Sequence, residues 1–380
     1  MVGRNRQLPE RRGPELVGVN SFGFGGTNAH AILRSDRTVT SFVQVPAGAS
    51  PPPLLLSAHS ADALPALAAA HLAAWPKDAR RVHNHIVASA HQRDALPHRL
   101  IVRGGAAEEM RAQLDGFVRG EASPSVLTDQ ALGTDLPVVF LFSGNGSQWA
   151  GMGRDAWEAN PVFREALTEI DAHFAKAQKW SITELLFAED LAPRLRRATY
   201  SQPLLFALQV ATVRALEAHG LRPHATLGHS VGEIAAAWCA GVLSLEQAID
   251  VVLARGRHQE AVRGSGAMAA LMLSDREARR FLMNAGAPEV EVAAINSWRS
   301  VTVSGPAAEI DKVLEAAAKL RISARRLDLD YPFHSVLLDP VRGPLLRELE
   351  GLKPLTPHLP IVTRLTHVLA PGLRGQQCFF

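Results

Sequence analysis

The chain has few of the residues from which disulfide frameworks, metal centres and membrane spans are built. Its 380 residues include two cysteines, Cys239 and Cys378, and two tyrosines. Two cysteines exclude a disulfide framework or a cysteine-rich metal site, and they fit a reducing compartment. A membrane span needs about 18 consecutive apolar residues, which the sequence lacks, and its charged, proline-containing start is unlike a signal peptide. We therefore expect a cytoplasmic protein that does not associate with membranes.

The charge balance is also modest. Charged residues make up 20% of the chain and the formal net charge is +3. There is no long run of lysine and arginine beyond a short arginine-rich start, so binding to nucleic acid is not supported. Hydrophobic residues make up 47%. This composition predicts a soluble globular protein, and the length suffices for two or three domains.

The first third of the chain predicts a hairpin followed by a small α/β unit. Residues 17–33 alternate around a glycine-rich loop at 23–26, which favours a tight turn between two strands. A proline-rich connector covers 45–53. Beyond it the periodicity predicts strands at 54–57 and 98–102 and helices at 61–74, 78–92 and 106–119, with a polar stretch near 128–135.

The remainder alternates strands with helices. Strands are expected at 137–142 and 225–228, with helices dominating from about 152 to 218, which predicts a parallel sheet covered by helices. The rhythm changes between 266 and 330. Strands at 268–272, 290–295, 300–304 and 322–327 and helices at 275–284 and 307–319 give the order β-α-β-β-α-β of a ferredoxin-like unit.

The sequence Gly228-His229-Ser230-Val231-Gly232 stands between the strand at 225–228 and a helix-forming segment. This is the setting in which the serine of a G-x-S-x-G motif becomes a nucleophile. Glycines permit a sharp turn, and the helix N-terminus directs N–H groups to the place where an oxyanion forms. The pattern also arises by chance, so the flanking strand and helix are what favour the catalytic interpretation.

Several spaced motifs together resemble a known family. Residues 143–149 (SGNGSQW), 228–233 (GHSVGE) and 331–334 (YPFH) have the order and spacing of the acyltransferase domain of type I polyketide synthases. The malonyl-CoA:acyl carrier protein transacylases are similar. Residues 20–30 (NSFGFGGTNAH) resemble the end of a ketosynthase domain. The resemblance implies a ketosynthase remnant at 1–35, a ketosynthase–acyltransferase linker at 36–134, an acyltransferase large subdomain at 135–265 and 331–380, and a ferredoxin-like subdomain at 266–330.

The resemblance also implies roles for individual residues. Ser230 is the expected nucleophile and His334 its general base. The backbone N–H groups of Asn145 and Val231 are the expected oxyanion hole. Arg255 is expected to pair with the free carboxylate of a malonyl-type unit, because a guanidinium offers a planar two-pronged donor.

Further positions match those that line the family's pocket, namely Gln202, His229, Asn296, Tyr331 and Phe333. Tyr331-Pro332-Phe333-His334 is a hybrid of two motifs of this family. Phe333 is typical of malonyl-selective members and Tyr331 of methylmalonyl-selective members. A single methyl group contributes only about 1–3 kcal/mol to discrimination. We expect malonyl to be preferred.

The implied reaction moves an acyl unit from CoA to a carrier thiol, in polyketide or fatty acid biosynthesis. CoA and the carrier's phosphopantetheine act as substrates, so no cofactor or metal is expected. The expected partners are an acyl carrier protein, the CoA thioester of a dicarboxylic acyl unit and the remaining polyketide synthase domains.

Two other functions stay open on the sequence alone. Residues 374–380 resemble no tail of this family, whereas family members continue with a helix whose backbone carbonyl orients the catalytic histidine. This favours a C-terminally truncated, inactive remnant. A plain α/β serine hydrolase is the other alternative, against which Arg255 argues. Single residues have structural alternatives too: Arg255 on a solvated basic face, His334 as a structural histidine, and Gln202 as a helix cap.

Overall fold

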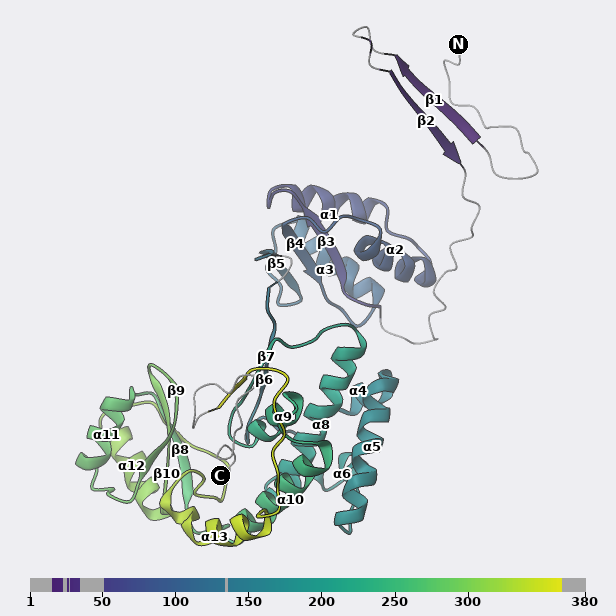
Figure 1. Ribbon diagram of the computed structural model, residues 1–380. Coiled ribbons are helices and arrows are strands. Elements are labelled where there is room, and N and C mark those ends of the chain that lie inside the picture. Colours follow the sequence, from purple (N-terminus) through teal and green to yellow (C-terminus); the bar gives the residue numbers. More distant parts are fainter. Residues whose placement is uncertain (1–15, 23–25, 27, 35–50, 134–135, 364–380) are drawn as a thin grey trace. The chain divides into compact units, whose positions relative to one another are not determined.

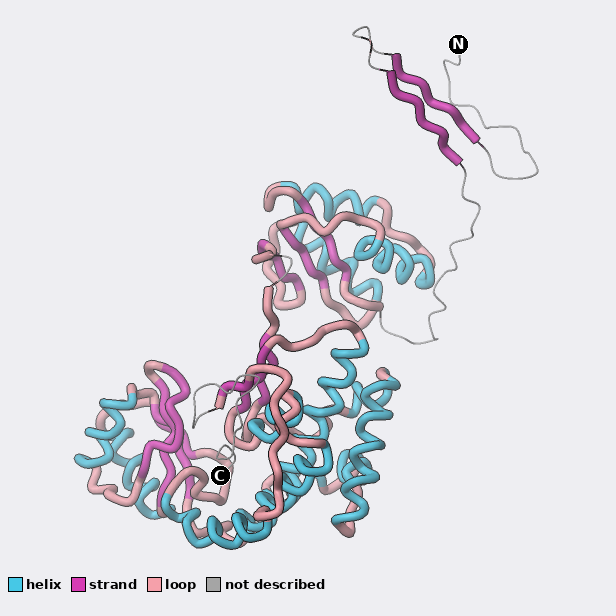
Figure 2. Tube along the Cα trace, in the orientation of Figure 1, coloured by secondary structure: helices cyan, strands magenta, loops and turns pink. Residues whose placement is uncertain are grey.

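The structure is a computed structural model in which residues 16–22, 26, 28–34, 51–133 and 136–363 are described. The chain divides into two compact units, Met1–Leu136 and Pro137–Phe380 (Figures 1 and 2). Expectations that concern residues 364–380, including the missing helix, lie outside the described residues.

The first unit begins with the predicted hairpin, in which β1 (Leu16–Phe22) pairs antiparallel with β2 (Asn28–Arg34). Its second part is an antiparallel sheet in the order β3-β4-β5, on which three helices pack. In β3, Leu54, Leu56 and Ala58 are buried whereas Leu55 is exposed, so one face of the sheet carries the core. The elements are β3 (Leu54–Ala58), α1 (Ala63–Ala73), α2 (Ala79–His91), β4 (His98–Val102), α3 (Ala107–Val118) and β5 (Val126–Gln130).

The strand β5 was not predicted. The sequence predicts a polar stretch near 128–135, which overlaps the end of this strand. Four of the five positions of β5 are exposed, so the apolar alternation that marks a strand is missing. It pairs with β4 over its whole length. These residues form a strand because their backbone pairs with β4, and such pairing leaves no pattern in the local sequence.

The second unit contains a parallel sheet in the order β12-β7-β6 and helices around it (Figure 1). Helix α8 is buried along most of its length and packs on both α5 and α10. The elements before the ferredoxin-like subdomain are β6 (Val139–Phe142), α4 (Arg154–Ala159), α5 (Pro161–Ala177), α6 (Ile182–Phe187), α7 (Leu191–Arg194), α8 (Ala198–Ala218), β7 (Ala225–Gly228), α9 (Gly232–Cys239) and α10 (Leu245–Glu260). Those after it are η1 (Val336–Leu338), α13 (Asp339–Glu348) and β12 (Ile361–Val362).

The inserted subdomain has the expected ferredoxin-like order, and its antiparallel strands run β11-β8-β10-β9 across the sheet. Its elements are β8 (Ala267–Leu271), α11 (Asp275–Asn284), β9 (Glu291–Ser297), β10 (Ser300–Gly305), α12 (Ala307–Lys319) and β11 (Ala324–Arg326). Both helices have the predicted bounds. Strand β11 is shorter than the predicted 322–327, because only three of its residues pair with β8.

Candidate active site

The parallel pairing of β6 with β7 brings two loops together. Phe142 lies opposite Gly228, so the loop after β6 and the turn after β7 leave the sheet side by side. The N–H of His229 donates to the carbonyl oxygen of Phe142 at 2.9 Å. Carboxyl ends of parallel strands are a common location for active sites. We call residues 143–148 the glycine loop.

The turn after β7 explains why the motif needs both of its glycines. A Cβ at Gly228 would lie 2.3 Å from the backbone nitrogen of Glu233, and one at Gly232 would lie 2.3 Å from the carbonyl oxygen of Phe142. Neither backbone atom can move aside easily. Ser230, between them, has φ 54°, in the left-handed region that non-glycine residues rarely adopt. Such strain in a sharp turn is typical of a nucleophile elbow.

The structure brings Ser230 and His334 together although 104 positions separate them. Oγ of Ser230 lies 2.9 Å from Nε2 of His334, at hydrogen-bonding distance. His334 also has a left-handed backbone, with φ 61°. A hydroxyl and an imidazole in this contact can exchange a proton, which is the chemistry of an activated nucleophile.

The backbone N–H groups of Asn145 and Val231 face no hydrogen-bond acceptor among the described residues. Val231 precedes the first residue of α9, and Asn145 belongs to the glycine loop. The loop packs closely, because a Cβ at Gly144 would lie 2.5 Å from the carbonyl oxygen of His229. The side-chain oxygen of Asn145 is buried and likewise has no partner in the described part of the chain.

Next to Ser230, α8 and α10 supply three polar side chains, Gln202, Arg255 and Gln259, which we call the polar wall. Nη1 of Arg255 donates to Oε1 of Gln202 at 2.6 Å, and Nη2 lies 3.4 Å from Oγ of Ser230. Desolvation by burial lowers the pKa of Arg255 to about 10, against an opposing attraction from Glu233. The guanidinium therefore remains a cation at neutral pH.

The predicted pocket residues Tyr331 and Phe333 are both buried, and their rings stack with centroids 4.8 Å apart. The hydroxyl of Tyr331 donates to Oε2 of Glu260 at 2.7 Å and accepts from the N–H of Ala198 at 2.9 Å. Burial raises the pKa of Tyr331. This tyrosine therefore anchors the segment that carries His334 to the helices α8 and α10.

The other two predicted pocket residues differ in their surroundings. His229 is exposed, directly before Ser230, and packs beside Gly144. Asn296 is exposed on β9, where its Nδ2 donates to Oγ1 of Thr302 at 2.9 Å. None of the hydrogen bonds described for Asn296 joins it to Ser230, His334 or Arg255.

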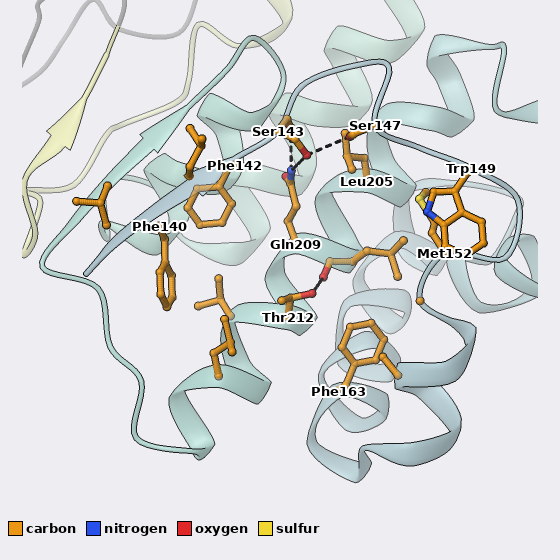
Figure 3. A pocket seen from close by; sticks show the side chains of 17 residues that line it. Phe140, Phe142, Ser143, Ser147, Trp149, Met152, Phe163, Leu205, Gln209 and Thr212 are labelled. Carbon is orange, nitrogen blue, oxygen red and sulfur yellow. Dashed lines mark hydrogen bonds between the residues drawn. The ribbon is translucent and has the colours of Figure 1, made fainter. Parts of the chain in front are cut away.

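Two cavities lie near the glycine loop. The smaller, of about 460 Å³, is lined by this loop and His229. The larger, of about 520 Å³, lies between β6, α5 and α8 and is lined by apolar side chains such as Phe142, Phe163 and Leu205 (Figure 3). Neither Ser230 nor His334 lines it. Gln209 crosses its edge and donates to the carbonyl oxygen of Ser143 at 2.8 Å, which ties the glycine loop to α8.

Sequence reasoning missed two residues of this site, Gln259 and Glu260. Both lie in the last turn of α10, and their partners come from distant segments. Gln259 is 6% exposed, which is unusual for glutamine, but burial is not visible in the sequence. Within the described ranges, none of the helices has the length and apolar character of a bilayer span. The same ranges hold no cluster of three or more His, Cys, Asp or Glu residues suited to a metal ion.

Comparison with known proteins gives two family matches. Residues 139–372 match the acyl transferase domain, and residues 1–102 match the ketoacyl-synthetase C-terminal extension. Erythronolide synthase EryA3 of Saccharopolyspora erythraea is 35% identical over 94% of this chain, which corresponds to 11% of that protein. Polyketide synthase GfsA of Streptomyces halstedii is 33% identical over 94% of this chain and 5% of its own length. The chain thus spans a small part of the curated relatives that it matches.

Solved structures of acyltransferases are also similar to this chain. The acyltransferase domain from module 8 of the salinomycin polyketide synthase aligns with a TM-score of 0.77 and 30% identity, over 84% of this chain and 75% of that chain. The malonyl CoA-acyl carrier protein transacylase of Coxiella burnetii aligns with a TM-score of 0.57 and 28% identity, over 62% and 75% of the two chains.

Proposed function

The chain belongs to the acyl transferase domain family of the polyketide synthases, and from that premise we propose that it loads a malonyl-type unit onto an acyl carrier protein. The unit moves from CoA to the phosphopantetheine thiol through an ester of Ser230. The single observation that carries the proposal is the 2.9 Å contact between Oγ of Ser230 and Nε2 of His334 beside the cationic Arg255.

In the first half-reaction, Oγ of Ser230 gives its proton to Nε2 of His334 and attacks the thioester carbonyl carbon. The N–H groups of Asn145 and Val231 donate to the resulting oxyanion. The C–S bond then breaks, and the CoA sulfur takes the proton from His334. In the second half, the carrier thiol gives its proton to His334 and its sulfur attacks the seryl ester. Oγ of Ser230 leaves and recovers the proton.

We propose that Arg255 selects the acyl unit. A guanidinium close to Ser230 favours an acyl group that ends in a carboxylate, and its charge disfavours a plain ester hydrolase. A type II carrier protein in complex with its malonyl-transacylase is among the solved structures similar to this chain, with a TM-score of 0.57 and 26% identity over 62% of this chain and 77% of that chain. That title supports a carrier protein as the partner here, together with the other domains of a polyketide synthase.

We further propose that Phe333 rather than Tyr331 limits the size of the acyl unit. The hydroxyl of Tyr331 is hydrogen-bonded to Glu260 and Ala198. Tyr331 can therefore influence the acyl unit only through its ring, which stacks on the ring of Phe333. Phe333 adjoins His334 and would crowd an α-methyl group, which favours malonyl. The reaction as proposed uses no metal or cofactor, and we propose a cytoplasmic location for it.

The test is intact-protein mass spectrometry after incubation with malonyl-CoA. We expect a malonyl adduct that is absent in Ser230→Ala and that transfers to a carrier protein bearing phosphopantetheine. Turnover by water without an adduct would instead support a hydrolase. A folded chain with neither adduct nor turnover would support the inactive remnant.

A further inference from the structure

The polar wall forms a relay of hydrogen bonds that begins at Gln259 and ends at Ser230. Oε1 of Gln259 accepts from Nε2 of Gln202 at 2.7 Å, and Oε1 of Gln202 accepts from Nη1 of Arg255 at 2.6 Å. Nη2 of the same guanidinium lies 3.4 Å from Oγ of Ser230. Gln202 is 0% and Gln259 is 6% exposed, so water does not compete for the bond between these two amides.

The chemistry of arginine fixes the direction of the relay. A guanidinium has donors and no acceptor, so Gln202 must turn its oxygen toward Arg255. The NH₂ group of Gln202 then points away from Arg255 and requires an acceptor, which Gln259 supplies. If the amide of Gln202 were flipped, two sets of N–H donors would face each other in a buried site, and neither would have a partner.

Helix packing places the three side chains together. Arg255 and Gln259 are four positions apart on α10 and therefore share one face. A Cβ at Gly256, between them, would lie 2.8 Å from the carbonyl oxygen of Ala198 at the start of α8. The glycine thus lets α10 approach the first turns of α8, where Gln202 is located.

We propose that Gln259 is a positioning residue for the selection of the acyl unit. It holds Gln202 in the orientation whose oxygen fixes the guanidinium of Arg255 beside Ser230. This inference rests on the proposed function, because it concerns how Arg255 meets the carboxylate of a malonyl-type unit. Without Gln259, the long side chain of Arg255 regains alternative rotamers, and carboxylate-bearing acyl groups lose their advantage.

The experiment offers the 380-residue chain malonyl-CoA and acetyl-CoA in competition and measures initial rates of acylation of Ser230 by intact-protein mass. Gln259→Met keeps the size of the side chain but removes the amide acceptor. We expect the ratio of malonyl to acetyl loading to fall about 10-fold. Gln259→Asn, which withdraws the acceptor by one methylene, should lower the ratio as well, and it decides the question if Gln259→Met does not fold. Gln259→Glu retains an oxygen at the same place and should keep the ratio within about 3-fold.

Gln247→Met is the matched control on the same helix. Gln247 closes the capping box with Ser244 and donates to the carbonyl oxygen of Lys353 at 2.9 Å, so its loss should lower stability and leave the ratio unchanged.

Three results overturn the proposal. One is an unchanged ratio in Gln259→Met and Gln259→Asn while Ser230 is still loaded, which leaves the proposed function standing. Another is an equal loss in Gln259→Glu, which would indicate packing instead of orientation. Failure of the unmutated chain to form any adduct would remove the proposed function and this inference together.

Discussion

The two groups of residues next to Ser230, the polar wall and the glycine loop, are built in different ways. The polar wall uses side chains, and its amides and guanidinium satisfy one another through hydrogen bonds. The glycine loop offers backbone N–H groups and leaves the buried oxygen of Asn145 without a partner in the described chain. Side chains can be exchanged to suit an acyl unit, whereas a backbone donor serves any acyl unit. The wall therefore fits a role in selection, and the loop fits a role in the chemistry common to all substrates.

The largest effect is expected from Gly144→Ala, which tests the glycine loop. The added Cβ would lie 2.5 Å from the carbonyl oxygen of His229 and 3.3 Å from Cβ of Ser230, so the loop must shift. Loss of one oxyanion donor costs about 10²–10³-fold in rate. We expect this loss for malonyl-CoA and acetyl-CoA alike, measured as initial rates of adduct formation. Gly351→Ala is the control, because nothing lies within 4 Å of its Cβ. A loss confined to malonyl-CoA would contradict the comparison.

Arg255→Met tests the polar wall and should act on one substrate. Removal of a charge-assisted contact costs about 10- to 100-fold. We expect malonyl loading to fall by this factor while acetyl loading changes little, as measured in separate single-substrate assays. Equal losses for both substrates would mean that the wall, like the loop, serves the chemistry in general.

The local features of the site could be predicted from the sequence, and the long-range ones could not. Ser230 and its glycines form a contiguous motif, and the start of α11 follows from the capping box of Ser274 and Glu277. Arg255 and His334 were predicted through the family resemblance. Gln259 was missed because its role depends on how α10 packs on α8, and helix packing leaves no motif in either helix.

A smaller effect, on how stability depends on pH, is expected at Glu260, which follows Gln259 on α10 and accepts a hydrogen bond from Tyr331. Burial alone would raise the pKa of Glu260, but hydrogen bonds from Tyr331 and Arg197, with the charge of Arg197, outweigh it and lower the pKa. A lowered folded pKa means stability that is present above the unfolded pKa and lost as pH falls through the folded one. The unfolding free energy of the unmutated chain should therefore fall between about pH 5 and pH 3 more steeply than that of Glu260→Gln. The measurement is the unfolding free energy from urea titrations at a series of pH values. Equal dependence of this free energy on pH in the two chains would show that the contact does not contribute.

The smallest effect is expected from Asn145→Ala. The proposed donor at this position is the backbone N–H, and the side-chain oxygen is a buried acceptor without a described partner. We expect less than about 3-fold change in acylation rate and no loss of unfolding free energy, because removing an unsatisfied acceptor is close to neutral. A large fall in rate would assign the carboxamide a role and make the polar wall and the glycine loop more alike.

The left-handed backbone at both Ser230 and His334 restricts which residues can replace them. A branched side chain at Cβ is poorly tolerated in that conformation, so threonine is a poor substitute for the serine even though it carries the same hydroxyl group. Cysteine, which is unbranched, meets no such obstacle. For anyone who redesigns the reaction, the shape of the main chain, more than the reactivity of the functional group, dictates which nucleophiles can be installed.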